Sequence, residues 1–402
     1  MRRVYLDHGT TTPLDPAVLE EMLPFLKNYF GNPSSFHYFG RPVRQALEKA
    51  RERVAGAIGA SPQEVVFTSG GTEAVNMAIS GAVAANSHKG NHIITCTVEH
   101  HASLNTCKGL AKKGYEVTFL PVDKYGMVKV EDVASAITGR TVLINIMHAN
   151  NEVGTVQPVA EIGRLAKDKG IIFHVDACAS FGRVGINVEE LGVDLLSLSS
   201  HKIYGPKGTG ALYIRKGVKW QQIFHGGAQE RLRRAGTENV PGIVGFGKAA
   251  ELAATRLEDD AAKLRALSGK VIEGILGKYE HVLLTGHPQE RLPGHASFCF
   301  KFIEGESLLL HLDMQGVAAS SGSACTAGSM EPSHVLTAMG ISPVDAHGSL
   351  MITLGRENTN EDVEYLLQVL EPIVNKLLEM SPLCDLDNCE IEEDCFSCTA
   401  RR

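Results

Sequence analysis

The stretch that decides the fold is residues 171–215, IIFHVDACASFGRVGINVEELGVDLLSLSSHKIYGPKGTGALYIR. It holds three short apolar runs, at 171–177, 194–200 and 210–215, which glycine-containing and polar segments separate. Runs of this apolar character are typical of strands in a sheet that is covered on both faces. The stretch therefore predicts three buried strands.

Similar runs alternate with helical patterns from about residue 62 onwards. They read EVVFTS at 64–69, HIITC at 92–96, EVTFLPV at 116–122 and TVLINIMHAN at 141–150. Such alternation is typical of a mainly parallel sheet with helices packed on each side. We therefore predict an α/β fold whose large domain contains a mainly parallel seven-stranded sheet.

The remainder of the chain indicates a second, smaller α+β domain. Residues 244–277 have the pattern of one long amphipathic helix, and strand-like runs follow at 281–286, 296–302 and 350–355, with a helical pattern at 360–380. We expect a large domain at 13–250, a small domain formed by 1–12 and 251–380, and an acidic cysteine-containing tail at 381–402.

Composition excludes several classes of protein. The 402 residues carry a formal net charge of -7, with Lys and Arg mixed among Asp and Glu, which argues against a nucleic-acid partner. No run resembles a signal peptide or a membrane span, so we expect a cytoplasmic protein with no membrane partner. Nine cysteines are too few for a disulfide scaffold in a chain of this size, so we expect thiols.

The first chemical signal is TSGGTEAVN at 68–76, where a predicted strand passes into a helix. Gly70 and Gly71 followed by Thr72 leave backbone N–H groups and a hydroxyl free to bind an anion. The alternative is a tight glycine turn with a threonine cap, because glycine turns alone are a weak signal. This segment therefore indicates a phosphate site only in combination with other residues.

Those other residues are Asp176, which ends one apolar strand, and Lys202, which follows the next. Both should lie where ligands bind in open α/β sheets, at the carboxyl ends of the strands. A lysine, an acid and a phosphate cup are the groups that pyridoxal phosphate (PLP) needs. The alternatives are a buried helix cap for Asp176 and a surface charge for Lys202.

Ten motifs together resemble the PLP-dependent cysteine desulfurases of the NifS and IscS type, which are class V aminotransferases. The resemblance covers roughly residues 4–375, and the motifs are YLDHGTTTPLD, GNPSSFH, TSGGTEAVN, EHHASL, NNEVGT, VDACASFGR, SSHKIYGPKGTGAL, QERLRRAGTEN, SSGSACTAGSMEPSH and LGRENT. It implies the PLP-dependent transferase fold type I in a homodimer with active sites at the subunit interface. The implied reaction takes sulfur from L-cysteine and leaves L-alanine, with a persulfide on the enzyme.

The resemblance also implies a role for individual residues. Lys202 would form the Schiff base with PLP, Asp176 would pair with the pyridine nitrogen, and His100 would stack on the ring and move protons. Asn151 and Arg356 would receive the substrate carboxylate, Asn151 also contacting the cofactor. The residues implied to hold the phosphate are Gly71, Thr72, Ser199 and His201, with Thr237 from the partner subunit. Without the resemblance, His100 would more simply be a residue at a helix start, and Arg356 one half of an exposed ion pair.

The resemblance makes Cys325 the residue that receives the sulfur. It lies among small polar residues in AASSGSACTAGSMEPSHVL, 318–336, which we expect to form a mobile loop able to carry a thiol between the pocket and the surface. The other cysteines in or beside apolar runs are expected to fill core space: Cys96, Cys107, Cys178 and Cys299.

Three positions depart from the usual family pattern. Ala179 stands where the family has a glutamine that bonds the cofactor's phenolic oxygen, His8 and Gly9 replace an Asn-Ala or Asn-Ser pair, and Met351 replaces a basic residue. Loss of the Ala179 hydrogen bond, worth roughly 1 kcal/mol, would retune the enzyme without abolishing activity. We assign no metal site to the catalytic residues.

The tail adds four cysteines among acidic side chains: Cys384, Cys389, Cys395 and Cys398. Their spacing leaves three readings open, namely metal or iron-sulfur cluster binding, sulfur relay, or an acidic tail with incidental cysteines. The main expectation is a cysteine desulfurase that supplies an iron-sulfur scaffold or another sulfur acceptor. The alternatives are a selenocysteine lyase, a cysteine β-eliminating lyase, and an impaired homologue acting as a scaffold or sulfur carrier.

Overall fold

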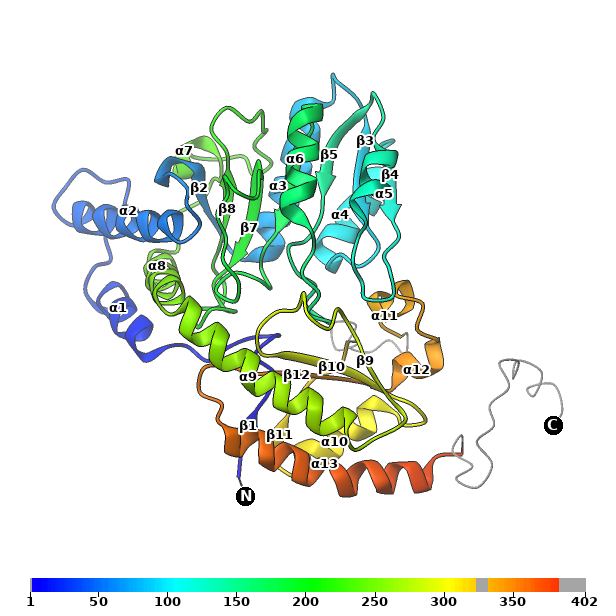
Figure 1. Ribbon diagram of the computed structural model, residues 1–402. Helices are drawn as coiled ribbons and strands as arrows, with labels where there is room; N and C mark the ends of the chain where they lie inside the picture. The colour runs from blue at the N-terminus through cyan, green and yellow to red at the C-terminus, as the bar shows by residue number, and fades with distance from the viewer. Residues whose placement is uncertain (1, 323–331, 383–402) are drawn as a thin grey trace.

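A computed structural model describes residues 2–322 and 332–382 (Figure 1). Its largest sheet has seven strands in the order β2-β8-β7-β6-β5-β3-β4. All neighbours are parallel except β8, which is antiparallel to both β2 and β7. The bounds are β2 Val65–Thr68, β3 His92–Cys96, β4 Glu116–Leu120, β5 Thr141–Asn145, β6 Ile172–Asp176, β7 Leu195–Ser199 and β8 Gly210–Ile214. The predicted mainly parallel seven-stranded sheet is confirmed.

Helices cover both faces of this sheet, which explains why its strands are almost entirely buried, with the edge strand β4 as the exception. Successive side chains of a strand point to opposite faces, and Ile93 accordingly lies in one hydrophobic cluster with α3 and α4, while Ile94 lies in another with α2, α6 and α8. The helices of this part are α1 Pro16–Lys27, α2 Gly40–Gly56, the 3-10 turn η1 Pro62–Glu64, α3 Gly71–Asn86, α4 His101–Ala111, α5 Val130–Ala136, α6 Val159–Lys169, α7 Gln229–Leu232 and α8 Val240–Thr255.

Most of the remaining elements surround a second, smaller core. An antiparallel sheet has the order β12-β10-β9, and a separate parallel pair joins β1 to β11. Figure 1 shows α13 along the side of these elements that lies away from the seven-stranded sheet. The bounds are β1 Val4–Tyr5, α9 Leu257–Leu276, β9 Val282–Leu284, β10 His295–Phe300, α10 Gly305–Met314, β11 Val317–Ala318, α11 His334–Ala338, α12 Pro343–His347, β12 Ser349–Thr353 and α13 Asn360–Met380.

The hydrophobic clusters bear on the domain division. One cluster combines Val4 and Leu6 with residues between Leu264 and Leu377. Cys299 and several residues between 335 and 346 instead join the cluster of the large sheet. We therefore keep the division into a large domain at 13–250, a small domain at 1–12 and 251–380, and a tail at 381–402 as a proposal.

The expectation of one long helix at 244–277 is wrong. The chain forms α8 and α9, and the break is at Arg256, where φ is −105° and ψ is 1°. The Arg256 N–H bonds to the Leu252 carbonyl and ends α8. Three acidic residues in the first turn of α9, at 258–260, favour a new helix N-terminus directly after it.

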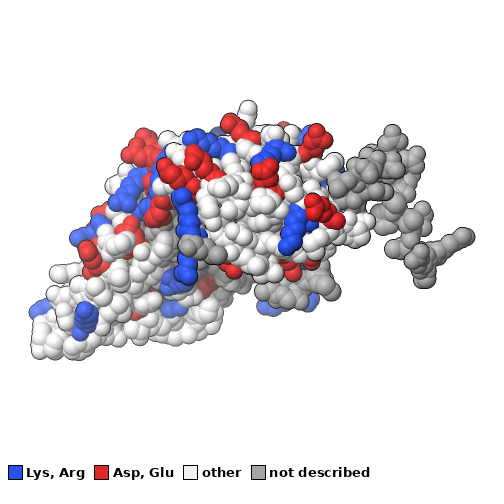
Figure 2. All heavy atoms as spheres, turned by 90° about the horizontal axis from the view of Figure 1, so that it is seen from below, with Lys and Arg blue, Asp and Glu red and all other residues white. Residues whose placement is uncertain are grey.

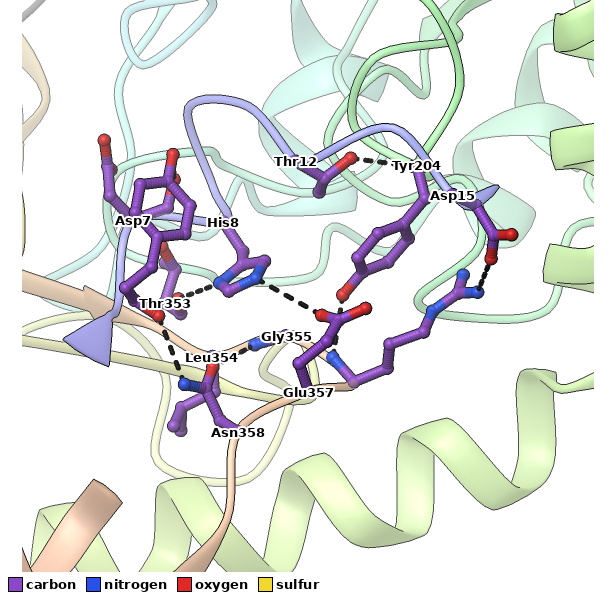
Figure 3. A network of polar contacts seen from close by, with 12 residues as sticks. Asp7, His8, Thr12, Asp15, Tyr204, Thr353, Leu354, Gly355, Glu357 and Asn358 are labelled. Carbon is purple, nitrogen blue, oxygen red and sulfur yellow. Dashed lines mark hydrogen bonds and ion pairs between the residues drawn. The ribbon is translucent and has the colours of Figure 1, made fainter. Parts of the chain in front are cut away.

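Residues 7–15 cross from the smaller core to the large sheet. After β1, the His8 N–H bonds to the Thr353 carbonyl, and the Thr12 N–H bonds to the His201 carbonyl at 2.9 Å. Figure 3 shows this crossing, with the His8 ring directed toward Thr353 and Glu357 and the Thr12 hydroxyl toward Tyr204. The crossing places Gly9 and Thr10 beside the segment that carries Lys202.

The surface in Figure 2 carries interspersed charges, with Lys and Arg beside Asp and Glu and no continuous basic area on the face shown. None of the helices in residues 2–322 and 332–382 combines the length and apolar character needed to cross a membrane.

Candidate active site

Eight of the predicted site residues line a single cavity of about 220 Å³ at the carboxyl ends of the parallel strands. His100 follows β3, Asn151 follows β5, Asp176 ends β6, and Ser199 ends β7. Parallel strands that end at one edge of a sheet bring residues far apart in sequence together. The eight residues are Gly71, Thr72, His100, Asn151, Asp176, Ser199, His201 and Lys202.

One end of the cavity is built to bind an anion. The helix α3 starts at Gly71, and its N-cap Gly70 has φ 153° and no side-chain cap. The first backbone N–H groups of this 16-residue helix therefore donate no hydrogen bond to a side chain at Gly70 and can bind an anion. A Cβ at Gly71 would lie too close to Cys178 Sγ, so a larger residue there would require that thiol to move. Ser199 Oγ is buried beside it without a hydrogen-bond partner among the described residues.

The His100 ring has a defined tautomer. Its Nδ1 accepts a hydrogen bond from the Ala102 N–H at 3.1 Å and thereby caps α4. Because the amide can only donate, a neutral ring carries its proton on Nε2. Burial, the largest influence, lowers the pKa of His100, and Lys202 and His101 lower it further against the opposing charge of Asp176. The neutral imidazole therefore exchanges protons at Nε2.

Asp176 and His201 are both held by neighbouring groups. Asp176 Oδ1 accepts from the Cys178 N–H at 3.0 Å. His201 Nδ1 lies 3.1 Å from Thr11 Oγ1, and burial together with Lys202 and Lys207 lowers the His201 pKa to about 4. His201 is therefore neutral near pH 7 and can serve the cavity as a hydrogen-bonding group.

Of the predicted site residues that the structure describes, two do not line this cavity. Arg356 Nη1 pairs with Asp15 Oδ2 at 2.9 Å, and its guanidinium lies 3.7 Å from the centre of the Tyr204 ring. Thr237 is exposed and borders a separate cavity near Glu230. The role of Arg356 with the substrate carboxylate and the role of Thr237 with the phosphate in the partner subunit therefore stay predictions.

Three of the four cysteines in the described residues are buried, as expected, and one is not. Cys96, Cys107 and Cys299 are buried, as expected for core residues. The expectation is wrong for Cys178, which is partly exposed and lines the cavity against Gly71, because it follows the end of β6 where the chain turns to the site. Cys325 and the four tail cysteines lie outside the described residues, as do residues 323–331 of the expected loop at 318–336. The described ends of that segment are partly regular, since Ala318 belongs to β11 and residues 334–336 belong to α11.

The three departures from the family pattern lie at or near the site. Ala179 and Met351 line the cavity. His8 is buried, with its Nδ1 3.3 Å from the Thr353 carbonyl and its Nε2 3.7 Å from Glu357 Oε2. Gly9 also borders the cavity. His8 therefore fixes the crossing segment, while the other three shape the space beside Lys202.

Sequence reasoning missed two buried carboxyl groups within the motifs EHHASL and NNEVGT. Burial raises the pKa of Glu99 to about 8, although Glu99 Oε1 accepts from the Met147 N–H at 2.7 Å. Burial likewise raises the pKa of Glu152 to about 7, and Glu152 lines the cavity. The available signal was a glutamate with no Lys or Arg within several residues in either motif.

Comparison with known proteins identifies the family. The family model described as aminotransferase class-V matches residues 4–366. The chain belongs to the class-V aminotransferase family. The cysteine desulfurase IscS of Dictyoglomus turgidum is 53% identical over 381 residues, covering 95% of this chain and 97% of the relative. That of Methanosarcina thermophila is 54% identical over 382 residues, covering 95% and 94%.

A solved structure of a NifS-like protein matches this class-V family member with a TM-score of 0.88 and 40% sequence identity, covering 94% of this chain and 100% of the other. The fold type I assignment is thereby confirmed, and the cofactor of such enzymes is PLP. The cavity suits PLP on its own geometry, since the uncapped start of α3, the close approach at Gly71 and the unpartnered Ser199 hydroxyl fit a phosphate.

The Ser199 hydroxyl gives a direct test of this fit. Ser199→Ala should weaken PLP binding by roughly 10- to 100-fold, because a hydrogen bond to a charged group contributes about 1.5–3 kcal/mol. The apo protein should lose almost no stability, because the hydroxyl has no hydrogen-bond partner to lose among residues 2–322 and 332–382. Titration of apo protein with PLP and thermal unfolding without PLP measure the two effects.

The control is Ser200→Ala, because the Ser200 hydroxyl is also buried and unpartnered in the described chain but does not line the cavity. Its PLP affinity should equal that of the unmodified protein. Equal affinities for the Ser199 and Ser200 variants would contradict the phosphate site.

The Glu152 carboxyl predicts a pH dependence of stability. Its pKa rises from 4.5 to about 7 on folding, so the folded protein retains a proton that the unfolded chain loses. The protonated Glu152 carboxyl makes its full contribution to the free energy of unfolding below pH 4.5. This contribution falls by at most about 3 kcal/mol as pH rises through about 7. Glu152→Gln should remove this loss, as measured by chemical unfolding at pH 5 and pH 8.

The comparison variant is Glu161→Gln, which changes an exposed glutamate on α6. It should leave the difference in stability between the two pH values unchanged. A Glu152→Gln protein with the same pH dependence as the unmodified chain would show that Glu152 ionises normally.

Proposed function

We propose that this protein is a cysteine desulfurase that converts L-cysteine into L-alanine and passes the sulfur, as a persulfide on Cys325, to an acceptor protein. The observation that carries the proposal is the convergence of Lys202, Asp176 and His100 on one cavity in a chain more than half identical to named cysteine desulfurases. The protein acts as a homodimer, and its acceptor is an iron-sulfur scaffold or another sulfur carrier. A cytoplasmic location stays a prediction.

Bound PLP supplies an electron sink that weakens the bonds around the α- and β-carbons of an amino acid. Lys202 would hold it covalently, and Asp176 would bond its ring nitrogen. The start of α3 and Ser199 would bind its phosphate, while Asn151 would orient the substrate. His100 would hold or move the substrate proton at Nε2, because its Nδ1 is engaged by the Ala102 amide.

The described thiols support the assignment of the nucleophile to Cys325. Burial raises the pKa of Cys107 and of Cys299 to about 12 and places that of Cys96 and that of Cys178 well above the ordinary thiol value. A protonated thiol is a poor nucleophile. Cys178 is therefore a poor candidate for attack on the substrate sulfur, although it lines the cavity.

Product analysis tests the function. Purified protein is incubated with L-cysteine and a reductant, and alanine, sulfide and pyruvate are measured together. Alanine and sulfide in equal amounts, without pyruvate, are the expected result. Pyruvate with sulfide would identify a β-eliminating lyase, a strong preference for selenocysteine would identify a selenocysteine lyase, and no turnover would identify a scaffold or carrier.

A further inference from the structure

The turn at α7 has an unusual backbone conformation. Glu230, Arg231 and Leu232 have φ values of 46°, 57° and 63°, so three consecutive residues with side chains occupy the left-handed region. The Cβ atom disfavours this region, and none of the three is the glycine, asparagine or aspartate that usually occupies it. Such a run persists only where its surroundings hold it in place.

A buried ion pair holds the turn. Arg51 of α2 donates from Nη1 to Glu230 Oε2 at 2.7 Å and from Nη2 to Glu230 Oε1 at 2.8 Å. The two side chains are 3% and 1% exposed. A buried, two-armed pair of this kind imposes a defined geometry, because either partner alone would be an uncompensated buried charge.

The same pair joins the turn to the edge strand β2. Glu230 Oε2 also accepts from the Phe67 N–H at 2.9 Å, and Arg51 Nη1 also donates to the Val65 carbonyl at 2.9 Å. Figure 1 shows α7 beside β2 at this edge of the large sheet. The turn is therefore fixed to the strand that leads into Gly71.

Further contacts hold the segment after the turn. Arg234 Nε pairs with Glu73 Oε1 at 2.9 Å, and the Gly236 N–H donates to Gln229 Oε1 at 3.1 Å. Thr237 follows directly and is exposed. The chain thus presents a hydroxyl at the surface from a segment that is fixed before any partner binds.

Resting on the homodimer of the proposed function, we propose that Glu230 is a positioning residue. Its pair with Arg51 locks the left-handed turn and thereby fixes Thr237 where it donates to the cofactor phosphate bound by a second copy of the chain. The effect of Glu230 on cofactor binding then acts across the dimer and not within its own subunit.

Mixed dimers with two affinity tags test this claim. In the first arrangement, one subunit carries Lys202→Ala and the other carries Glu230→Gln. In the second, one subunit carries both substitutions and the other is unmodified. Both dimers contain the same substitutions and a single Lys202, so their overall stability is matched. The readout is the dissociation of PLP from that single site, followed by the chromophore that borohydride fixes onto Lys202.

The first dimer should bind PLP as tightly as the unmodified site, because the Lys202 site faces the turn with an intact Glu230. The second should bind roughly tenfold or more weakly, approaching a matching dimer with Thr237→Ala, since loss of a bond to a charged group is of this size. Equal binding in the two dimers, or weakening only in the first, would overturn the proposal.

Two further variants complete the test. Arg51→Lys keeps the charge but loses the two-armed geometry, and it should give the same asymmetry even if Glu230→Gln fails to fold. Glu48→Gln weakens the 3.4 Å contact of Glu48 with the buried Arg51 and the exposed ion pair with Arg231 but leaves the Arg51–Glu230 pair intact, so both arrangements should be unchanged. Unmodified protein that is monomeric also overturns the inference, whereas dimers that bind no PLP refute the proposed function itself.

Discussion

Lys202→Ala should give a folded protein that retains no chromophore reducible by borohydride and loses desulfurase activity by at least about 10²- to 10⁴-fold, the range for a positioned acid–base group. Lys202 is the lysine that lines the cavity together with Asp176 and His100. Its removal takes away both the covalent attachment of the cofactor and an amine that can move protons. Absorbance spectra before and after borohydride, with peptide mapping of the fixed adduct, measure the first effect.

The matched control is Lys207→Ala, five residues further along the same segment and exposed. It should retain the chromophore, the fixed adduct and the activity. A Lys202→Ala protein with the same reducible chromophore as the control would show that another lysine carries the cofactor.

Cys325→Ser should separate the reaction into two parts. Substrate should still bind and perturb the cofactor spectrum, because the cavity residues are unchanged. Alanine formation should fall by at least about 10²-fold, since a serine hydroxyl is a far weaker nucleophile than a thiolate. Rapid mixing with L-cysteine follows the spectral change, and quenched samples give the alanine formed.

The companion variant replaces the four tail cysteines, Cys384, Cys389, Cys395 and Cys398, by serine and keeps Cys325. With an added reductant it should form alanine at the unmodified rate. Undiminished alanine formation by Cys325→Ser would point to another thiol as the sulfur acceptor, because β-elimination releases pyruvate and not alanine. Combining the two variants would then show whether that thiol lies in the tail.

The sheet could be predicted because its strands are buried on both faces, which leaves short apolar runs such as 92–96 and 172–176 between clear turn signals. The helix at 360–380 was predicted for a similar reason, since its apolar side faces one core along its whole length. The position of the cavity could be predicted because the carboxyl ends of parallel strands meet at one edge of a sheet. The break at Arg256 was not predicted, because the residues before and after it continue a helical pattern.

Several features at and near the site depend on contacts that no short motif contains. The pairing of Arg356 with Asp15 joins residues 341 positions apart. The turn at Glu230 contains no glycine or asparagine that would indicate a left-handed backbone, and only its pair with Arg51 explains it. Cys178 resembles a core residue in sequence, since whether a side chain after a strand faces the core or the site depends on the turn that follows.

The pairing of β1 with β11 has a consequence for synthesis on the ribosome. Val4 pairs with Val317 and Tyr5 with Ala318, so β1 cannot pair until the ribosome has synthesised β11, more than 300 residues later. At about 5–20 residues per second, that wait is on the order of tens of seconds. Gly9 and Thr10, which follow β1, border the cavity. Nascent chains can therefore form the large sheet early but complete the wall of the cavity only after residue 318 has emerged from the ribosome. We expect PLP to bind only late in the synthesis of the chain.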